Sequence, residues 1–213
     1  MIVYMILLFI TALFAYIIGS LDTMVIASNF VFHRSLRKLG KGDVWLSNFK
    51  RIYGYGGFLK LLAVELVKDI IPILIGGLLL GFKEHADVGR AFAGFCMVLG
   101  RLYPIFYRFR GGHASLAMAV AAFSADISVG IATLVVIALA TFITKYPSVG
   151  AVIGAFAFLG VSVIVVEDSL LTKLAIFTAA LIIFKHIPAM IRVFRGTEIR
   201  FSNREDITYK LDE

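Results

Sequence analysis

The sequence predicts an all-α integral membrane protein with seven transmembrane helices, its N-terminus outside and its C-terminus in the cytoplasm. Three observations point to this class. Hydrophobic residues make up 60% of the 213-residue chain and charged residues only 16%, and the mean hydropathy is +0.93. Apolar runs long enough to cross a bilayer recur along the chain. Lys and Arg gather in alternate gaps between these runs.

The composition excludes several classes of protein. Soluble domains are about 45–50% apolar and about 25% charged, so a water-soluble globule is excluded, as are a disordered chain and a collagen-like fibre. The only cysteine, Cys96, lies inside an apolar run. No intramolecular disulfide can form, and a disulfide scaffold is therefore excluded as well.

The apolar runs define the expected spans, each of which needs about 20 mostly apolar residues. The first run is interpreted as a retained span because it has no positive segment before it and is too long for a signal peptide. Asp126 lies near the middle of the run 115–144, which favours two short spans over one tilted helix. We expect one polytopic domain over 1–213, with spans at about 2–32, 58–82, 91–107, 115–126, 127–144, 149–166 and 170–190.

The orientation follows from the positive-inside rule. With the N-terminus outside, the cytoplasmic segments are 33–56, 107–114, 145–148 and the tail from 185, and these hold most of the Lys and Arg. The outside turns hold only Lys83, Arg90 and Lys173. Every glycine-rich or basic interruption is then cytoplasmic.

Two of these interruptions combine glycines with cations. Gly40, Lys41 and Gly42 are followed by Lys50 and Arg51. Closely spaced glycines let backbone N–H groups approach an anion, and Arg can grip a phosphate with two hydrogen bonds. The other interpretation is a basic loop that contacts anionic lipid headgroups. Both interpretations remain open from composition alone.

The second interruption runs from Gly100 through Arg108 and Arg110 to Gly111, Gly112 and His113. Arg101 lies close to the end of its span, so we expect its side chain to snorkel outward. Histidine is the side chain type that ordinarily changes its charge near neutral pH, and His113 closes this segment. It is either a headgroup contact or a catalytic group.

Ionisable residues inside the second span form a third candidate. Glu65, Lys68 and Asp69 are spaced at i, i+3 and i+4, so they share a face and can pair. Charges at membrane depth are costly and face a bundle interior or water. They are either a self-neutralised packing element or a functional group. Asp22 follows Gly19 and Ser20 and is interpreted as a bend at the cytoplasmic end of the first span.

The sequence predicts no metal and no cofactor. The four histidines, His33, His85, His113 and His186, are scattered without an HExxH spacing, and there is no Walker loop. The basic residues are explained by topology, so no nucleic-acid partner is expected.

The order of these segments resembles the bacterial acyl-phosphate:glycerol-3-phosphate acyltransferase family, PlsY. The family's first segment reads roughly Gly-Ser-Gly-Asn-x-Gly-Ala-Thr-Asn-x-x-Arg-x-x-Gly, and its second Gly-His-x-Phe-Pro-x-Phe-x-x-Phe-Lys-Gly-Gly-Lys-Gly. The resemblance covers nearly the whole chain. The matching residues are Gly19, Ser20, Gly40, Gly42, Ser47, Asn48, Arg51, Gly54, Glu65, Lys68, Gly100, Tyr103, Pro104, Phe106, Phe109, Arg110, Gly111, Gly112, Ser148, His186, Gly196, Thr197 and Glu198.

Several departures fall at positions that bind substrate in the family. The residues that differ are Lys41 (for Ser), Asp43 (for Asn), Trp45 (for Gly), Leu46 (for Ala), Arg101 (for His), His113 (for Lys), Ala114 (for Gly) and Ala189 (for Asn). Trp45 is the most serious change, because an indole occupies space where the backbone meets the ligand.

The resemblance implies transfer of an acyl group from acyl phosphate to the sn-1 hydroxyl of glycerol 3-phosphate, in a multi-pass protein of the bacterial inner membrane surrounded by phospholipid. It implies His186, Lys41 and His113 as catalytic residues. It implies substrate binding by Gly40, Gly42, Ser47, Asn48, Arg51, Arg110, Gly111 and Gly112. The alternatives are a catalytically impaired paralogue with a binding or regulatory role or another acceptor, and a small transporter.

Overall fold

The fold is all-helical over the part of the chain that the structure, a computed structural model, describes. The backbone is described for residues 1–30, 46–112 and 114–198, and the side chains for 1–27, 54–112 and 114–198. The expected helical class is confirmed over these residues. The elements are α1 (Ile2–Ser20), α2 (Thr23–Phe30), α3 (Leu46–Gly81), α4 (Ala86–Leu102), the short 3₁₀ helix η2 (Ile105–Tyr107), α5 (Ser115–Ala125), α6 (Ile127–Thr144), α7 (Pro147–Val165) and α8 (Ser169–Phe194).

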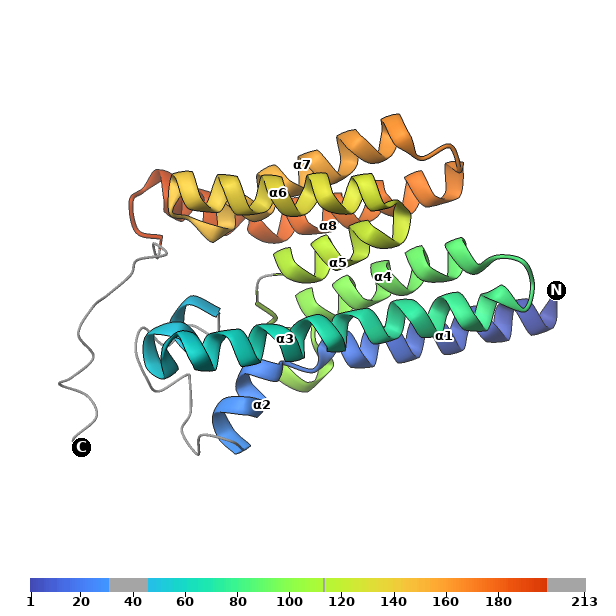
Figure 1. The fold of residues 1–213 in the computed structure, drawn as a ribbon, viewed down its shortest axis with the longest axis horizontal. Helices are drawn as coiled ribbons and strands as arrows, with labels where there is room; N and C mark the ends of the chain where they lie inside the picture. Colours follow the sequence, from blue (N-terminus) through green and yellow to red (C-terminus); the bar gives the residue numbers. More distant parts are fainter. Residues whose placement is uncertain (31–45, 113, 199–213) are drawn as a thin grey trace.

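The helices lie side by side in a bundle (Figure 1). The α1 and α3 helices lie on one side and α6 and α7 on the other, with α4, α5 and α8 between them. The chain alternates in direction. As a result α1, α4, α6 and α8 finish at the end away from the N-terminus, where α3, α5 and α7 begin. We call this the motif end, because the glycine-rich and basic segments of the sequence lead into or out of it.

Four described helices, α1, α6, α7 and α8, are long and apolar enough to cross a membrane by length and composition. Their outward faces carry large apolar side chains, such as Phe9, Phe142 and Phe177, which are 68%, 72% and 60% exposed. Small residues instead fill the interior, which is typical of helices packed within lipid. The chain is therefore an integral membrane helix bundle.

Helix boundaries differ from the expected spans at four places. The run 2–32, expected as one span, contains two helices, because the first helix ends at Ser20. Asp22 then accepts hydrogen bonds from the backbone N–H groups of Met24 (3.1 Å) and Val25 (3.4 Å) at the start of α2. The expected loop 33–56 is already helical from Leu46, with a kink at Gly54 (φ 70°).

The other two differences involve prolines. Pro147 was expected in a loop but opens α7, where its missing N–H costs nothing. Proline tends to kink or end a helix, yet α8 continues past Pro188 to Phe194, beyond the expected end of the span at about 190.

Asp126 separates α5 from α6, as the sequence predicts. Its carboxylate accepts the backbone N–H of Ser128 at 2.6 Å and so caps the N-terminus of α6. This hydrogen bond holds the pKa of the Asp126 carboxyl below its ordinary value. Asp168 caps α8 in the same way, accepting from Leu170 N at 2.7 Å and Leu171 N at 3.1 Å.

Glycines bring the backbones of neighbouring helices into contact. A Cβ atom at Gly19 would lie 2.2 Å from the carbonyl oxygen of Met97, and one at Gly100 would lie 2.3 Å from that of Tyr16. The α1 and α4 helices therefore cross with no room for a side chain between them. Gly76 and Gly89 join α3 to α4 in the same manner.

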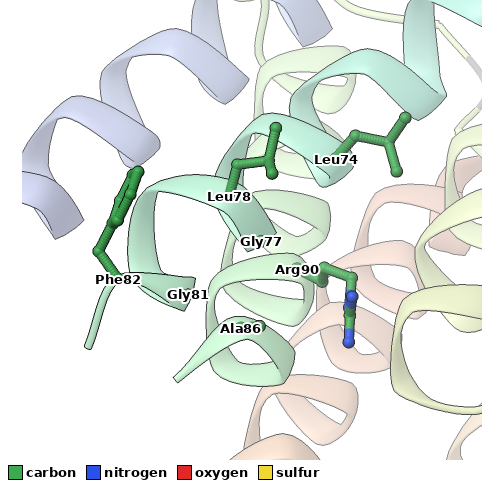
Figure 2. A pocket seen from close by; sticks show the side chains of 7 residues that line it. All are labelled: Leu74, Gly77, Leu78, Gly81, Phe82, Ala86 and Arg90. Atoms are coloured by element: carbon green, nitrogen blue, oxygen red, sulfur yellow. The ribbon is translucent and has the colours of Figure 1, made fainter. Parts of the chain in front are cut away.

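The α3–α4 hairpin carries an apolar groove at the end opposite the motif end. Figure 2 shows Leu74 and Leu78 on α3, Phe82 just beyond the end of α3, and Arg90 on α4. The groove has a volume of about 580 Å³. Arg90 pairs with Asp87 one turn earlier on α4. The groove contains none of the residues that the sequence singled out for chemistry.

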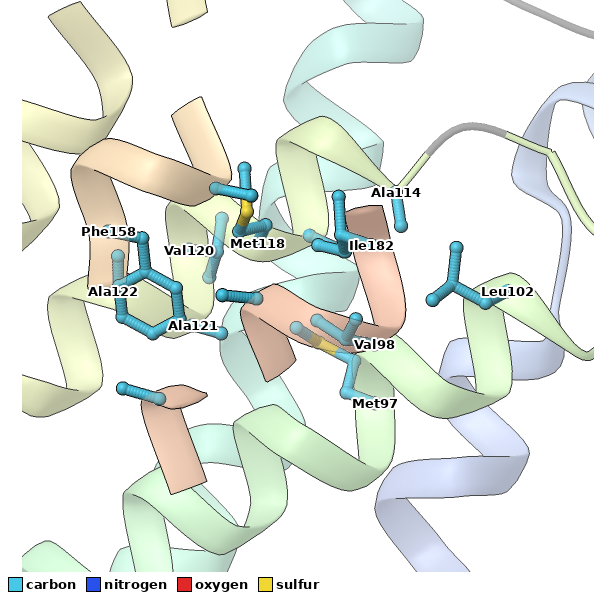
Figure 3. Close-up of a cluster of buried hydrophobic side chains, with 14 of the residues drawn as sticks. Met97, Val98, Leu102, Ala114, Met118, Val120, Ala121, Ala122, Phe158 and Ile182 are labelled. Atoms are coloured by element: carbon cyan, nitrogen blue, oxygen red, sulfur yellow. The ribbon is translucent and has the colours of Figure 1, made fainter. Parts of the chain in front are cut away.

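The core is formed mainly by α4, α5 and α8 (Figure 3). Met97, Leu102, Met118 and Ile182 are fully buried there. Cys96 belongs to the same cluster and is 6% exposed. This core fixes α8 against α4, and it thereby fixes His186 relative to the loop that follows α4.

We expect Gly100→Ala to lower the free energy of unfolding by about 1–3 kcal/mol, because its methyl group would overlap the Tyr16 carbonyl and force α1 away from α4. Thermal unfolding of the purified protein in detergent measures the effect. Gly160→Ala is the matched control, since nothing lies within 4 Å of a Cβ at that position. Equal melting temperatures for the two variants would contradict the close crossing.

Candidate active site

Buried charges meet at the motif end where α1, α3 and α4 come together. Glu65 and Asp69 on α3 are 0% and 1% exposed, and Arg101 on α4 is 8% exposed. Glu65 pairs with Lys68 at 2.9 Å and with Arg101 at 3.0 Å, and Lys68 lies 3.4 Å from Asp69. We call Glu65, Lys68, Asp69 and Arg101 the buried ion cluster.

The pairing within α3 that the spacing predicts is confirmed by these distances. The expectation for Arg101 is wrong, because its side chain does not snorkel outward. It turns into the bundle, where it neutralises Glu65 and reaches the carbonyl oxygen of Leu21 at 3.4 Å. A buried Glu65 carboxylate without enough counter-charge would be strongly destabilising, and Arg101 supplies this charge from α4.

The loop that follows α4 packs tightly against the end of that helix. Tyr16 on α1 donates its hydroxyl to the carbonyl oxygen of Tyr103 at 2.8 Å. A Cβ at Gly111 would lie 2.3 Å from the carbonyl oxygen of Arg101, so only glycine fits there. Arg108 and Phe109 have positive φ angles of 54° and 58° and turn the chain back on itself.

The side chains of Arg108 and Arg110 project from this loop and are exposed. Neither forms an ion pair with a residue in the described part of the chain. Arg110 is therefore an exposed cation next to two glycines in the sequence, Gly111 and Gly112. A phosphate group suits such an arrangement, because it accepts hydrogen bonds from both.

His186 lies on α8 near the motif end and is 3% exposed. Its Nδ1 atom lies 2.8 Å from the carbonyl oxygen of Ile182. A carbonyl oxygen only accepts, so Nδ1 carries the proton and Nε2 is the ring nitrogen that can take one up. The backbone of α8 thus fixes both the tautomer and the direction of the ring.

The chain beyond α8 folds back onto the start of α7. Glu198 accepts the hydroxyl of Ser148 at 2.6 Å and pairs with Nε of Arg192 at 2.6 Å. Gly196, at φ 68°, makes the turn that permits this. Glu198 is also close enough to act electrostatically on His186. These contacts bring together three residues that carried the resemblance: Ser148, His186 and Glu198.

Sequence reasoning missed the local role of two cations. The positive-inside pattern explains Lys185 by topology alone, but its ammonium group lies 4.5 Å from the centroid of the Tyr103 ring. The same pattern explains Arg192 by topology alone, yet Arg192 pairs with Glu198. Its position six residues before an acid, across the end of a helix, was the signal available in the sequence.

The remaining expected site residues are only partly described. Gly40, Lys41, Gly42, Trp45 and His113 lie outside the described residues. Ser47, Asn48 and Arg51 are in the first turns of α3, and their side chains are outside the description. The described members, Arg110, Gly111, Gly112 and His186, all belong to segments at the motif end.

Comparison with known families identifies the chain. The family model described as glycerol-3-phosphate acyltransferase matches residues 9–196. The chain belongs to the glycerol-3-phosphate acyltransferase family. The expected resemblance is confirmed, and the match covers the residues that carried it from Gly19 to Gly196.

Individual relatives agree with this assignment. Glycerol-3-phosphate acyltransferases from Thermoanaerobacter sp. (strain X514) and Staphylococcus carnosus are 27% and 29% identical to the chain. The alignments cover 92% and 87% of this chain, and 97% and 94% of those relatives. A relative of the same name from Coxiella burnetii is 29% identical over 89% of this chain and 95% of its own length.

Solved structures of the family share the fold. A crystal structure of PlsY (YgiH), an integral membrane glycerol 3-phosphate acyltransferase, in its glycerol 3-phosphate form has a TM-score of 0.76 and 25% identity, over 92% of this chain and 96% of that chain. The lysophosphatidic acid form of PlsY gives a TM-score of 0.75 at 24% identity, over 92% and 95%. Neither the paralogue nor the transporter interpretation is favoured by these likenesses.

We expect Ser148→Ala to lower the free energy of unfolding by about 1.5–3 kcal/mol, since a buried hydrogen bond to a charged carboxylate is lost. Chemical denaturation in detergent measures the change. In Ser124→Ala, the control, only a bond to the carbonyl of the preceding turn at Ala121 is lost, so a smaller change is expected. A Ser148→Ala loss no larger than that of the control would show that Glu198 does not depend on Ser148.

Proposed function

We propose that the chain is an acyltransferase that moves an acyl group from acyl phosphate to the sn-1 hydroxyl of glycerol 3-phosphate, giving lysophosphatidic acid for phospholipid synthesis. The observation that carries the proposal is the family match over residues 9–196. The described residues of its basic and glycine-rich segments also gather at one end of the bundle.

The reaction requires the protein to position the two substrates and to neutralise their phosphate charges, and it requires no covalent intermediate with the protein. The sn-1 oxygen attacks the acyl carbonyl carbon, the bond between that carbon and the phosphate oxygen breaks, and inorganic phosphate leaves. The hydroxyl proton is given up as the new ester forms. Acyl phosphate is already activated, so holding two phosphates and the hydroxyl in line supplies much of the rate.

His186 is the residue we assign to the proton. Nδ1 donates to the Ile182 carbonyl, so Nε2 is the basic ring nitrogen, and we assign it to accept the hydroxyl proton as the ester forms. Glu198 favours the positive charge that the ring then acquires. Lys41 and His113, the other two catalytic candidates, are assigned to phosphate neutralisation.

The phosphate groups are assigned to the glycine-rich segments. Arg110 offers a guanidinium next to Gly111 and Gly112, and its side chain is exposed, as contact with a soluble substrate requires. The segment that contains Gly40, Gly42, Ser47, Asn48 and Arg51 is assigned to the same task. Arg101 is not, because its guanidinium is committed to Glu65.

The topology we propose has seven spans, with the N-terminus outside and the motif end in the cytoplasm. Acyl phosphate and glycerol 3-phosphate then reach the site from the cytoplasm, while the acyl chain lies among helices in the hydrocarbon. The positive-inside bias of the sequence supports this orientation. The bacterial inner membrane and its phospholipids form the surroundings of such a protein.

The direct test is acyl transfer by the purified protein in detergent, with palmitoyl phosphate and labelled glycerol 3-phosphate. Labelled lysophosphatidic acid together with released inorganic phosphate is the expected result. If a folded, monodisperse sample forms no product, the proposed reaction fails and the family scaffold serves another acceptor.

We expect His186→Gln to lower kcat by about 10²–10⁴-fold, the usual size of a general-base contribution. Glutamine can still occupy the buried position but takes up no proton. Initial rates at saturating palmitoyl phosphate, with the melting temperature recorded in parallel, measure the effect. A kcat within about threefold of wild type in a folded variant would remove His186 from the chemistry, because loss of a general base costs at least about 10²-fold.

We expect Arg110→Ala to raise KM for glycerol 3-phosphate or palmitoyl phosphate by about 10–100-fold, because a charge-assisted contact with a phosphate is lost. Arg90→Ala, at the opposite end of the bundle, is the matched control and should leave both KM values unchanged. Arg51→Ala is expected to abolish transfer. Equal KM values in Arg110→Ala and Arg90→Ala would exclude Arg110 from the phosphate site.

A further inference from the structure

The buried ion cluster includes a residue that the family segment lacks. Arg101 stands where that segment has histidine, and the substitution changes both the charge and the reach of the side chain. We propose that Arg101 is a positioning residue: it acts through Glu65 on α3 to hold the end of α1 and the loop after α4 in place, and it does not itself bind substrate. The proposal rests on the acyltransferase function proposed above.

The contacts of Arg101 are all internal. One terminal nitrogen, Nη2, lies 3.0 Å from Oε1 of Glu65, and the other, Nη1, donates to the carbonyl oxygen of Leu21 at 3.4 Å. The side chain is 9% exposed and that of Glu65 is 0% exposed. Both terminal nitrogens of this buried guanidinium therefore already have partners within the protein. Few of its hydrogen-bond donors remain for a soluble phosphate.

The first segment that these contacts hold is the end of α1, at Leu21. Its carbonyl lies just beyond the last residue of α1, where helix carbonyls lose their partners within the helix. Both Arg101 and Lys68 donate to it, the latter at 3.0 Å. The chain continues from Leu21 into α2. The two cations thus fix the end of α1 from which α2 departs.

The second segment is the loop after α4, which contacts that helix at Gly111. A Cβ there would lie 2.3 Å from the carbonyl oxygen of Arg101 and 2.5 Å from that of Leu102. The backbone at Gly111 therefore packs directly against the backbone at the end of α4. Any shift of α4 relative to α3 is passed directly to Gly111 and its neighbour Arg110, because no flexible side chain lies between them.

The charges explain why the arginine is needed. Lys68 is shared between Glu65 and Asp69, so one ammonium group serves two carboxylates. Asp69 Oδ2 has no hydrogen-bond partner among the described residues. Without Arg101 the cluster would have one cation for two buried carboxylates. The end of α4 would then be expected to move until water or another cation reached Glu65.

The test compares Arg101→Gln, Glu65→Gln and the double variant. Each single variant leaves a buried charge without its partner, so we expect KM for glycerol 3-phosphate to rise about tenfold or more. The double variant replaces the ion pair with two amides that can bond to each other. We expect its KM to return to within about threefold of wild type.

Two outcomes would overturn the proposal. If Arg101 binds phosphate directly, the double variant stays as impaired as Arg101→Gln, because restoring the fold cannot restore a lost ligand. If Arg101 only supports folding, the single variants lose active protein but keep the wild-type KM in the folded fraction. Arg101→Lys keeps one charge, and we expect it to resemble wild type more closely than Arg101→Gln.

A measurement on the wild-type protein covers the case in which the single variants do not fold. Phenylglyoxal modifies accessible arginines, and mass spectrometry maps the sites. We expect Arg110 to be modified and to be protected by glycerol 3-phosphate, and Arg101 to remain unmodified with or without it. Modification of Arg101 that glycerol 3-phosphate prevents would overturn the proposal.

Failure of the proposed function gives a different pattern. The wild-type protein would then form no lysophosphatidic acid, whatever the state of Arg101. Equilibrium binding of labelled glycerol 3-phosphate then replaces KM in the same set of variants. Recovery of binding in the double variant supports the positioning role, and a lack of recovery overturns it.

Discussion

The motif end depends on the neutralisation of one buried carboxylate, that of Glu65. A carboxylate that is buried in a membrane protein needs counter-charges from its own chain. The partners of Glu65 come from two helices, since Lys68 lies one turn away on α3 and Arg101 lies on α4. Both cations also reach the carbonyl of Leu21 at the end of α1. A shift of α1, α3 or α4 relative to the others would therefore break contacts of buried charges. A buried charge that loses its partner is strongly destabilising.

Glycine makes these contacts geometrically possible. Gly19 and Gly100 bring the backbones of α1 and α4 together, and Gly76 and Gly89 do the same for α3 and α4. The cations on α3 and α4 can span from one helix to the next because no side chain separates them. Gly19 and Gly100 also belong to the segments that resemble the family. Part of that resemblance therefore reflects helix packing, and it need not mean contact with substrate.

Local patterns in the sequence predict much of this fold, and contacts between distant residues account for what they miss. Hydropathy indicates the helical membrane class, Asp126 marks the break between α5 and α6, and the spacing of Glu65, Lys68 and Asp69 predicts their pairing. The burial of Arg101 depends on a residue 36 positions earlier, on another helix. The contact between Ser148 and Glu198 spans 50 positions. Pro188 does not end α8, because packing of the helix outweighs the local preference.

The burial of Cys96 has a practical consequence. This residue is the chain's only cysteine, and it is 6% exposed within the core of α4, α5 and α8. Thiol-reactive reagents should therefore leave the native protein largely unlabelled. A cysteine introduced at an open surface position, as in Gly160→Cys, would become the principal attachment point for a fluorophore or spin label. Pairs of such probes, one on α7 and one near the loop after α4, would report the distance between the two halves of the bundle during turnover without first removing the native thiol.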